Sequence, residues 1–408
     1  MSDEKVLVVY VDGWDRRYID EAHAPFMSEQ FSRRPWVKTT APASVDLLPT
    51  ILTGTRPDQH GMYGVRLRPP WPRTLAQRAV DLLPDWLTTS VQCILFGVSG
   101  EFDLPAVPPR RRRLFDMQRS KVPRSKRGLS VLLELGGMPT CMGVVGEENS
   151  RYIYSTSSDP VSSHLKNVGN GDRALEFLQI YAMDLVYRWN YANEPMIEKY
   201  ARRVDDFLRR LHAKCSKTGV TLVVLSDHGY DATEGSVNSM RAVRRLRIPR
   251  SEYTEFIEIT SARYWFHSER ARREITAALE ALEHTAVHRA ADLRQWGVEL
   301  QGKQYGEFFC LTDPGWVFHP NDFHNPLGNF VLGIKDPKQR GRLTSPKHRG
   351  NHVLRPGIPA ASGFVMVLDE RYRATKSDGV LENIAPTLLS MLGREAPDSM
   401  SGKPIFER

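Results

Sequence analysis

The chain has 408 residues, of which 41% are hydrophobic and 25% are charged. These are ordinary values for a globular protein, and they exclude a disordered chain, a collagen-like chain and a coiled coil. Lysine and arginine together number 56 and aspartate and glutamate 48, which gives a formal net charge of +8. The length predicts two to four domains, or one large α/β domain with insertions.

All of the excess charge lies in one segment, residues 105–127. This segment contains nine basic residues and one acid, whereas the rest of the chain has 47 residues of each sign. We therefore predict a neutral protein with one basic segment, which is either a solvated loop or a contact with an anionic partner, a membrane surface or another subunit. Nucleic acid is not favoured, because no known binding motif is present and Phe115 is the one aromatic residue of the segment.

The sequence gives no sign of membrane insertion or secretion. No run of about 18 apolar residues is present, so we expect no transmembrane helix. Residues 1–5 lead directly into a strand-like stretch and lack the order of a signal peptide. The four cysteines show no CxxC spacing, which favours free thiols. We therefore expect a cytoplasmic protein.

The first predicted element is a strand at residues 6–11, a continuous apolar run typical of a parallel strand buried on both faces. Further strand patterns follow at residues 140–145, 177–183, 220–225 and 363–368. Helical patterns alternate with them at residues 45–52, 129–135, 195–211 and 383–392. This alternation predicts an α/β fold, a doubly wound and mostly parallel sheet with helices on both faces.

Two stretches interrupt the alternation. Residues 66–127 are rich in proline and arginine and form the predicted basic insertion. Residues 230–349 contain an arginine-rich strip at 241–250 and an amphipathic pattern near 269–283. We predict a catalytic core from residues 1–229 and 350–408, and an inserted cap subdomain from residues 230–349.

Acidic residues follow three of the predicted strands. Asp12, Asp184 and Asp227 stand at these ends, and His228 comes directly after Asp227. Each aspartate alone is explained by turn chemistry. Ligands in an open parallel sheet sit beyond the carboxyl ends of the strands, so three acids and a histidine there predict a divalent metal site. Zn²⁺ is the favoured ion, with Mn²⁺ and Ca²⁺ as alternatives.

Ser44 stands at the start of the predicted helix at residues 45–52. There its hydroxyl would lie near unpaired backbone N–H groups, which stabilise a developing alkoxide or a bound phosphate. A plain helix N-cap is the competing interpretation, since serine is favoured at that position.

The order of these motifs resembles the alkaline phosphatase superfamily, on the branch of type I phosphodiesterases and nucleotide pyrophosphatases, with sulfatases and cofactor-independent phosphoglycerate mutases as relatives. The family's first metal-binding aspartate is matched by Asp12, and its nucleophile by Ser44, nine residues before Thr53-Gly54. The remaining matches are Pro57-x-x-His60-Gly61, Ser226-Asp227-His228-Gly229 and Gly350-x-His352. Together they span residues 6–404 in the family's order.

The resemblance implies a fold like that of alkaline phosphatase and a divalent ion held by Asp12, Asp227, His228 and the Ser44 oxygen. It also implies that Ser44 is the nucleophile and passes through a phospho-enzyme intermediate. A second ion would be held by Asp184, a histidine four residues later, and His352.

One position departs from the family. The expected Asp-x-x-x-His reads Asp184 to Arg188 here, and a guanidinium stays protonated and does not coordinate metal. The resemblance therefore implies one tight metal site and a doubtful second site. Either the second ion binds weakly, or Arg188 replaces it as a catalytic cation. Asp159 with His164 is a weaker alternative to Asp184, because its spacing is wrong.

The predicted cap would select the substrate. Candidate contacts for an anionic phosphate- or sulfate-ester substrate are His319, His324, Lys347 and Arg349.

The leading functional prediction is a metal-dependent phosphodiesterase or phosphatase. Two alternatives stay open, namely a sulfuric-ester or phosphonate hydrolase on the same scaffold, and a noncatalytic binding protein with a degenerate second metal site. A modified sulfatase nucleophile is not expected, because Asp46 and Leu48 stand where the formylglycine signature has proline and arginine.

Overall fold

The computed structural model describes residues 4–43, 47–62, 87, 132–135, 137–155, 157, 159–298, 306–322, 348–352, 355 and 357–408. The chain divides into two compact units. The first comprises Met1–Gly61, Lys126–Tyr230 and Leu354–Arg408, and the second comprises Met62–Ser125 and Asp231–Val353. The predicted core differs from the first unit by one residue at its break after 229 and by four residues where it resumes, and residues 62–125, which the prediction placed within the core, belong to the second unit. The predicted basic insertion lies, apart from Leu87, outside the described residues.

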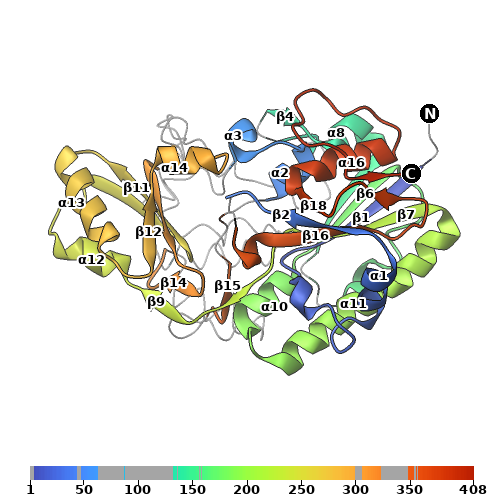
Figure 1. The fold of residues 1–408 in the computed structure, drawn as a ribbon, viewed down its shortest axis with the longest axis horizontal. Helices are drawn as coiled ribbons and strands as arrows, with labels where there is room; N and C mark the ends of the chain where they lie inside the picture. Colours follow the sequence, from blue (N-terminus) through green and yellow to red (C-terminus); the bar gives the residue numbers. More distant parts are fainter. Residues whose placement is uncertain are drawn as a thin grey trace. The chain divides into compact units, whose positions relative to one another are not determined.

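A seven-stranded sheet forms the centre of the first unit, in the order β18-β2-β16-β7-β1-β6-β5 (Figure 1). Its strands are β1 (Lys5–Val11), β2 (Trp36–Thr40), β5 (Ser150–Ser155), β6 (Leu175–Ile180), β7 (Val220–Ser226), β16 (Ser362–Val367) and β18 (Asp378–Val380). β16 is antiparallel to both of its neighbours, and the other adjacent strands pair in parallel. The sheet is therefore mostly parallel, as the alternating pattern predicts.

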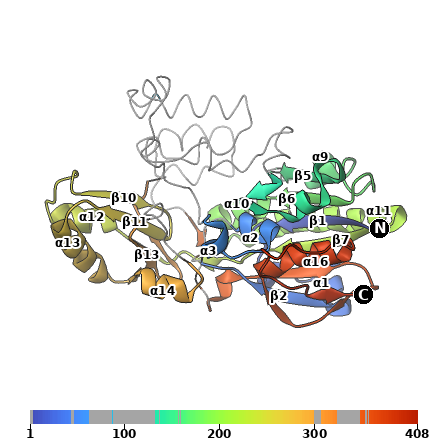
Figure 2. The same cartoon turned by 90° about the horizontal axis from the view of Figure 1, so that it is seen from above.

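Helices cover both faces of this sheet (Figure 1, Figure 2). One layer is formed by α1 (Pro25–Arg33), α10 (Ala182–Asn190) and α11 (Glu194–Thr218), and the other by α2 (Leu48–Thr53), α8 (Cys141–Val145) and α16 (Ile384–Met391). The doubly wound α/β architecture predicted from the sequence is confirmed. The shorter helices of this unit are α3 (Pro57–His60) and α9 (Pro160–His164), and its two-stranded pairs are β3 (Glu134–Leu135) with β4 (Met138–Pro139) and β17 (Arg373–Ala374) with β19 (Phe406–Glu407).

Helix α11 illustrates how the sequence determines where a helix begins and ends and which face it buries. Pro195 stands in its first turn, and Gly219 ends it with a left-handed φ of 68°. Its buried residues recur every three or four positions and include Ile197, Val204 and Leu211. They pack against the β1 side chains that point to this face of the sheet, among them Val9. Full burial of such an aliphatic side chain contributes about 1.5–3 kcal/mol.

Two predicted strands differ in the structure. Residues 141–145 form the helix α8 instead of a strand, and Thr140 is its N-cap, whose Oγ1 accepts the Gly143 N–H. An apolar run this short does not distinguish strand from helix by its period. The strand predicted at 177–183 ends at Ile180, and α10 begins at Ala182, so Asp184 lies in the first turn of a helix.

Further boundaries also differ from the sequence patterns. Helix α2 begins at Leu48, three residues later than predicted. Of the helix predicted at 129–135, residues 134–135 form the strand β3. Strand β5 was missed, because its sequence mixes arginine, serine and tyrosine rather than showing an apolar run.

The second unit contains an antiparallel sheet in the order β10-β11-β13-β12. These strands are β10 (Tyr253–Ile257), β11 (Ser261–Phe266), β12 (Thr285–His288) and β13 (Phe308–Thr312). Its helices are α12 (Ser239–Arg245), α13 (Glu269–Glu280) and α14 (Ala290–Gln295), and α13 matches the predicted amphipathic segment. Its described residues also form two short pairs, β9 (Gly235–Val237) with β14 (Trp316–Phe318) and β8 (Asp231–Ala232) with β15 (Gly350–Asn351).

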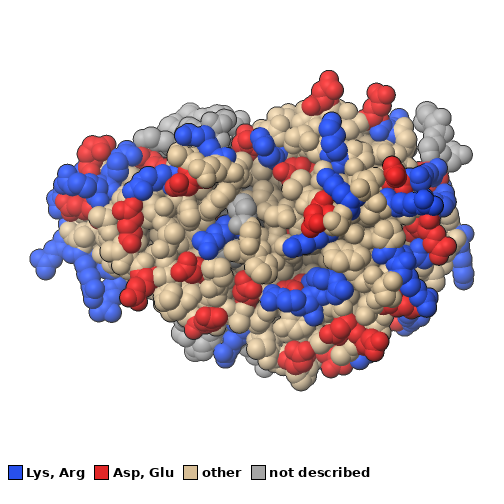
Figure 3. Space-filling view, viewed as in Figure 1, with Lys and Arg blue, Asp and Glu red and all other residues tan. Residues whose placement is uncertain are grey.

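The surface agrees with the balanced charge count outside residues 105–127. Figure 3 shows basic side chains interspersed with acidic ones over the face in view. None of the described helices combines the length and the apolar composition needed to cross a bilayer. Three cysteines, Cys141, Cys215 and Cys310, lie in the described ranges, and each is buried with a free thiol.

Candidate active site and metal centre

The site begins where β1 ends. Asp12 follows Val11, and the main chain turns at Gly13, whose φ of 65° is left-handed. A Cβ atom at Gly13 would lie 2.9 Å from Cε2 of Tyr230 and 3.2 Å from Cε1 of His228. Glycine is therefore required at this turn both by the backbone conformation and by the close approach of two rings.

Asp227 and His228 reach the same edge of the sheet because β7 lies parallel to β1 in the neighbouring position. The Asp227 carboxylate is held by three hydrogen bonds. Oδ1 accepts the N–H groups of Gly13 and His228, each at 3.0 Å, and Oδ2 accepts the hydroxyl of Tyr10 at 2.5 Å. These bonds fix the orientation of a carboxylate that is 2% exposed.

His228 presents one ring nitrogen to the carboxylates. Its Nδ1 lies 2.9 Å from the carbonyl oxygen of Gly229, and since a carbonyl only accepts, Nδ1 carries the proton. The other ring nitrogen, Nε2, lies 3.8 Å from Oδ1 of Asp12 and 3.7 Å from Oδ2 of Asp227. The Nδ1 contact is the one that usually orients a metal-binding histidine.

Asp12, Asp227 and His228 fit a divalent ion. Their ligand atoms all lie within 4.8 Å of one another, and all three residues are buried. Tetrahedral ligands at about 2.1 Å from an ion would be about 3.4 Å apart, so a shift of a few tenths of an ångström closes the two histidine distances. One imidazole and two carboxylates suit Zn²⁺ or Mn²⁺.

The electrostatics of the site also favour a cation. Burial, followed by the neighbouring charges of Asp227 and Asp184, raises the pKa of Asp12 well above its usual range, although the Gln179 amide lowers it in part. Buried carboxylates this close repel one another unless protons or a cation neutralise them. A divalent ion between Asp12 and Asp227 would remove this repulsion.

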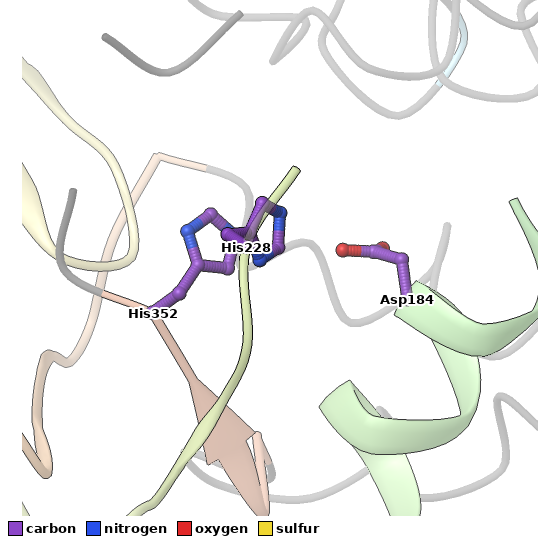
Figure 4. A group of neighbouring side chains, drawn as sticks. All are labelled: Asp184, His228 and His352. Atoms are coloured by element: carbon purple, nitrogen blue, oxygen red, sulfur yellow. The ribbon is translucent and has the colours of Figure 1, made fainter. Parts of the chain in front are cut away.

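Asp184 and Arg188 form an ion pair on α10. The Nη2 atom of Arg188 lies 3.0 Å and 2.9 Å from the two carboxylate oxygens of Asp184. The hydroxyl of Tyr230 also donates to Oδ1 of Asp184. Figure 4 shows the carboxylate of Asp184 directed from α10 towards His228.

Arg188 is a permanent cation in this setting. Burial alone would lower its pKa, but Asp184, Tyr181 and Tyr230 raise the pKa of Arg188 well above its usual range. Its guanidinium lies against the carboxylate that the family resemblance assigns to a second ion. The residues of the first unit therefore fit one divalent ion at Asp12, Asp227 and His228, and the departure at Arg188 leaves Asp184 paired with a guanidinium.

The Thr53-Gly54 and Pro57-to-Gly61 motifs have a packing role. Gly54 ends α2 in a left-handed conformation with a φ of 60°, and a Cβ there would lie 3.0 Å from Cδ of Pro386 and 3.2 Å from the Glu382 carbonyl oxygen. Oγ1 of Thr50 lies 3.0 Å from Nε2 of His60, which ties α2 to α3. These contacts secure the segment that follows Ser44.

Several predicted site residues lie either outside the described residues or in the second unit. Ser44, His324 and Lys347 lie outside the described residues. His319, Arg349 and His352 belong to the second unit, where their main-chain atoms bond to Val237, Thr233 and Thr260 respectively. Their roles at the site stay predictions.

Sequence reasoning missed two residues that contact the carboxylates. Tyr10 bonds Asp227, and Nε2 of Gln179 donates to Oδ2 of Asp12 at 2.8 Å. The available signal was a polar residue inside a buried strand, since Gln179 interrupts the apolar stretch of β6 and is only 6% exposed.

A family model described as type I phosphodiesterase / nucleotide pyrophosphatase matches residues 6–99 and 169–352, which is more than half of the chain. The chain belongs to this family. The family resemblance inferred from the motif order is thereby confirmed.

Solved structures that resemble this chain carry the same fold. Human ectonucleotide pyrophosphatase / phosphodiesterase 5 covers 98% of this chain and 97% of its own, with a TM-score of 0.61 and 15% identity. The inactive murine protein of that name, in complex with AMP, covers 97% and 96%, with a TM-score of 0.59 and 15% identity. At this identity the likeness concerns the fold.

Among curated proteins, the 2,3-bisphosphoglycerate-independent phosphoglycerate mutases of Escherichia coli K12 and Shigella dysenteriae are 31% identical to this chain over 80 residues. The match covers 20% of this chain and 15% of each mutase. The chain thus spans only about 15% of the length of these relatives.

Proposed function

We propose that this member of the type I phosphodiesterase / nucleotide pyrophosphatase family is a metal-dependent hydrolase of phosphate esters, acting as a phosphodiesterase or nucleotide pyrophosphatase. The observation that carries the proposal is the buried donor set of Asp12, Asp227 and His228 at the carboxyl edge of the parallel sheet. It lies where open α/β sheets bind their ligands, and in the motif order of the family.

Asp12, Asp227 and His228 would hold one divalent ion, for which Zn²⁺ is our preferred candidate. Three protein ligands leave a fourth position open, the arrangement that is typical of catalytic rather than structural zinc. When bound, the ion would polarise a phosphoryl oxygen and neutralise charge on the substrate.

Ser44 is our proposed nucleophile. Its Oγ would form a bond to phosphorus while the bond to the leaving oxygen breaks, and water would then hydrolyse the phosphoserine and restore the hydroxyl. Three observations support this role. Ser44 lies nine residues before Thr53-Gly54, the contacts of Gly54 and Thr50 hold α2 in place, and the family model matches residues 6–99.

Arg188 is our proposed substitute for a second ion. The ion pair with Asp184 supports this role, since it keeps a fixed positive charge beside the donor set. The guanidinium would then bind a non-bridging phosphoryl oxygen through its remaining N–H groups. The competing arrangement is a weak second ion held by Asp184 and His352.

We further propose that the substrate is anionic and that His319, His324, Lys347 and Arg349 contribute to its binding. A nucleotide is a plausible substrate class, because AMP is bound in a murine relative of the same fold.

The proposal is tested by hydrolysis of bis-p-nitrophenyl phosphate, p-nitrophenyl phosphate and p-nitrophenyl sulfate by the full chain, before and after chelation and with Zn²⁺, Mn²⁺ or Ca²⁺ restored. We expect the diester to be the best substrate and activity to require the metal. Equal rates with and without chelator would contradict the proposal, and so would a preference for the sulfate.

A further inference from the structure

The donor set rests on a hydrogen-bonded layer of side chains from three adjacent strands. Strands β1, β6 and β5 are neighbours, and Tyr10 of β1 pairs in register with Gln179 of β6. Phe177, two residues before Gln179, pairs in register with Tyr152 of β5. Register partners in a sheet point to the same face, so Tyr10, Gln179 and Tyr152 share one face of the sheet.

Aromatic contacts hold this layer together. The ring of Phe177 lies 6.1 Å from that of Tyr10, edge to face, and 5.9 Å from that of Tyr152, stacked. Tyr10 and Phe177 are fully buried. The Tyr10 ring therefore has little freedom to move, and the half-buried Tyr152 ring is held by its stacking on Phe177.

The Tyr10 hydroxyl fixes Asp227. It donates to Oδ2 at 2.5 Å, and Oδ2 is also the oxygen that lies 3.7 Å from Nε2 of His228. The other oxygen of Asp227 is taken by two backbone N–H groups. Without the tyrosine, the oxygen that faces the ion position would lose its only side-chain donor among the described contacts.

A relay of two hydrogen bonds fixes Asp12. Tyr152 donates its hydroxyl to Oε1 of Gln179 at 2.5 Å, and this sets which end of the amide points to Asp12. Nε2 of Gln179 then donates to Oδ2 of Asp12 at 2.8 Å. The other oxygen, Oδ1, is the one directed at Nε2 of His228.

We propose that Tyr10, Gln179 and Tyr152 are positioning residues that set the metal affinity of the Asp12, Asp227 and His228 centre. Tyr10 acts on Asp227, Gln179 acts on Asp12, and Tyr152 acts only through Gln179. The inference rests on the proposed function, because it assumes that these three ligands bind an ion.

The test is calorimetric titration of the metal-free full chain with Zn²⁺. Tyr10→Phe and Gln179→Met each remove one donor while keeping size, and each should weaken Zn²⁺ binding by about 10- to 100-fold, the effect typical of lost partners of metal ligands. Tyr152→Phe should weaken it less, by about fivefold, because it removes a bond one step further away.

The relay predicts a specific non-additivity. Adding Tyr152→Phe to Gln179→Met should change the Zn²⁺ dissociation constant by less than about twofold, because residues that act through one another do not add. Adding Tyr152→Phe to Tyr10→Phe should instead multiply the two effects. If Gln179→Met does not fold, the Zn²⁺ affinities of Tyr10→Phe and Tyr152→Phe still test the inference.

Two further measurements separate positioning from packing. The visible spectrum of the Co²⁺-loaded chain should change in Tyr10→Phe and Gln179→Met, since it reports the ligand geometry. Tyr264→Phe, which removes a buried hydroxyl in β11 of the second unit, is the matched control and should alter neither the spectrum nor the affinity.

The outcomes are distinct. Wild-type affinity in Tyr10→Phe and Gln179→Met, with a lower unfolding midpoint, would overturn the inference and leave the proposed function standing. A wild-type chain that binds no divalent ion would overturn both. Weaker Zn²⁺ binding with the predicted non-additivity supports the inference.

Discussion

Arg188 and Asp184 stand one turn apart on α10, with Nη2 of the guanidinium 2.9 Å and 3.0 Å from the two carboxylate oxygens. Arg188 stands at the position where the family resemblance predicts a histidine ligand. It makes the number of metal ions per chain the most informative quantity to measure.

Replacing Arg188 by histidine should create a second metal site. The substitution restores Asp-x-x-x-His on α10 and frees Asp184 from the guanidinium. We expect the metal content of dialysed protein, measured by plasma mass spectrometry, to rise from one ion to two. Arg188→Gln, which removes the charge but adds no imidazole, is the control and should keep one ion. Two tightly bound ions in the wild type would show that Arg188 does not replace a metal.

Replacing Ser44 by alanine should abolish turnover without affecting the fold. Deleting a catalytic nucleophile costs several orders of magnitude in kcat, on the order of 10⁴- to 10⁶-fold. The measurement is the rate of diester hydrolysis together with the thermal unfolding midpoint. Ser216→Ala, at an exposed site on α11, is the control. A rate within tenfold of wild type would exclude Ser44 as the nucleophile.

Replacing Asp12 by asparagine should stabilise the metal-free chain while it removes activity. The neutral amide still accepts the Gln179 N–H but no longer repels Asp227 and Asp184. We expect the free energy of unfolding of the metal-free protein to rise by about 1 kcal/mol, the pattern typical of active-site charges held in strained proximity. Asp398→Asn, at an exposed site, should leave it unchanged. A loss of stability would mean that Asp12 has a structural role.

The pH dependence of the free energy of unfolding should show that protonated His23 stabilises the fold. This buried residue lies 2.8 Å from a carboxylate oxygen of Asp20 and 2.6 Å from one of Glu194 at the start of α11. Burial alone would lower its pKa, but the two carboxylates raise the pKa of His23 above its ordinary value of 6.5.

A histidine with a raised folded-state pKa stabilises the fold below its unfolded pKa, and this stabilisation is lost as pH rises through the folded value. His23→Gln should therefore cost about 1 kcal/mol at pH 6 and progressively less at higher pH, as denaturant unfolding would show. Glu194→Gln should reduce the pH dependence in part. A cost that grows with pH would contradict the assignment.

The described cysteines should resist alkylation in the native chain. Burial raises the pKa values of Cys141, Cys215 and Cys310 to about 12, so almost no thiolate is present at pH 8. Iodoacetamide at that pH should modify these three residues only after denaturation, as peptide mass spectrometry would detect. Rapid native labelling of any of them would show that its surroundings open readily.

The sequence predicted the elements whose signal is local. Residues 6–11 and 220–225 are apolar runs, and both became central strands because a parallel strand buried on two faces needs apolar residues throughout. Asp12, Asp227 and His228 could be assigned for a related reason, since Asp12 and Asp227 directly follow such strands and His228 is the next residue after Asp227. The strand predicted at residues 140–145 was wrong, because five apolar or small residues show too little periodicity to distinguish a helix from a strand.

The partners of these ligands depended on the tertiary structure. Tyr10 and Gln179 are far apart in the chain, and only the order and register of β1, β6 and β5 place Tyr10 against Asp227, Gln179 against Asp12, and Tyr152 against Gln179. Likewise, the sequence showed that Arg188 stands where a histidine is expected, but only the helical geometry of α10 and the approach of Tyr230 decided that its guanidinium pairs with Asp184. The identity of the candidate ligands can be predicted because they follow the strands directly in the sequence. Their orientation depends on side chains from neighbouring strands, and the distances between those side chains cannot be inferred from a single sequence.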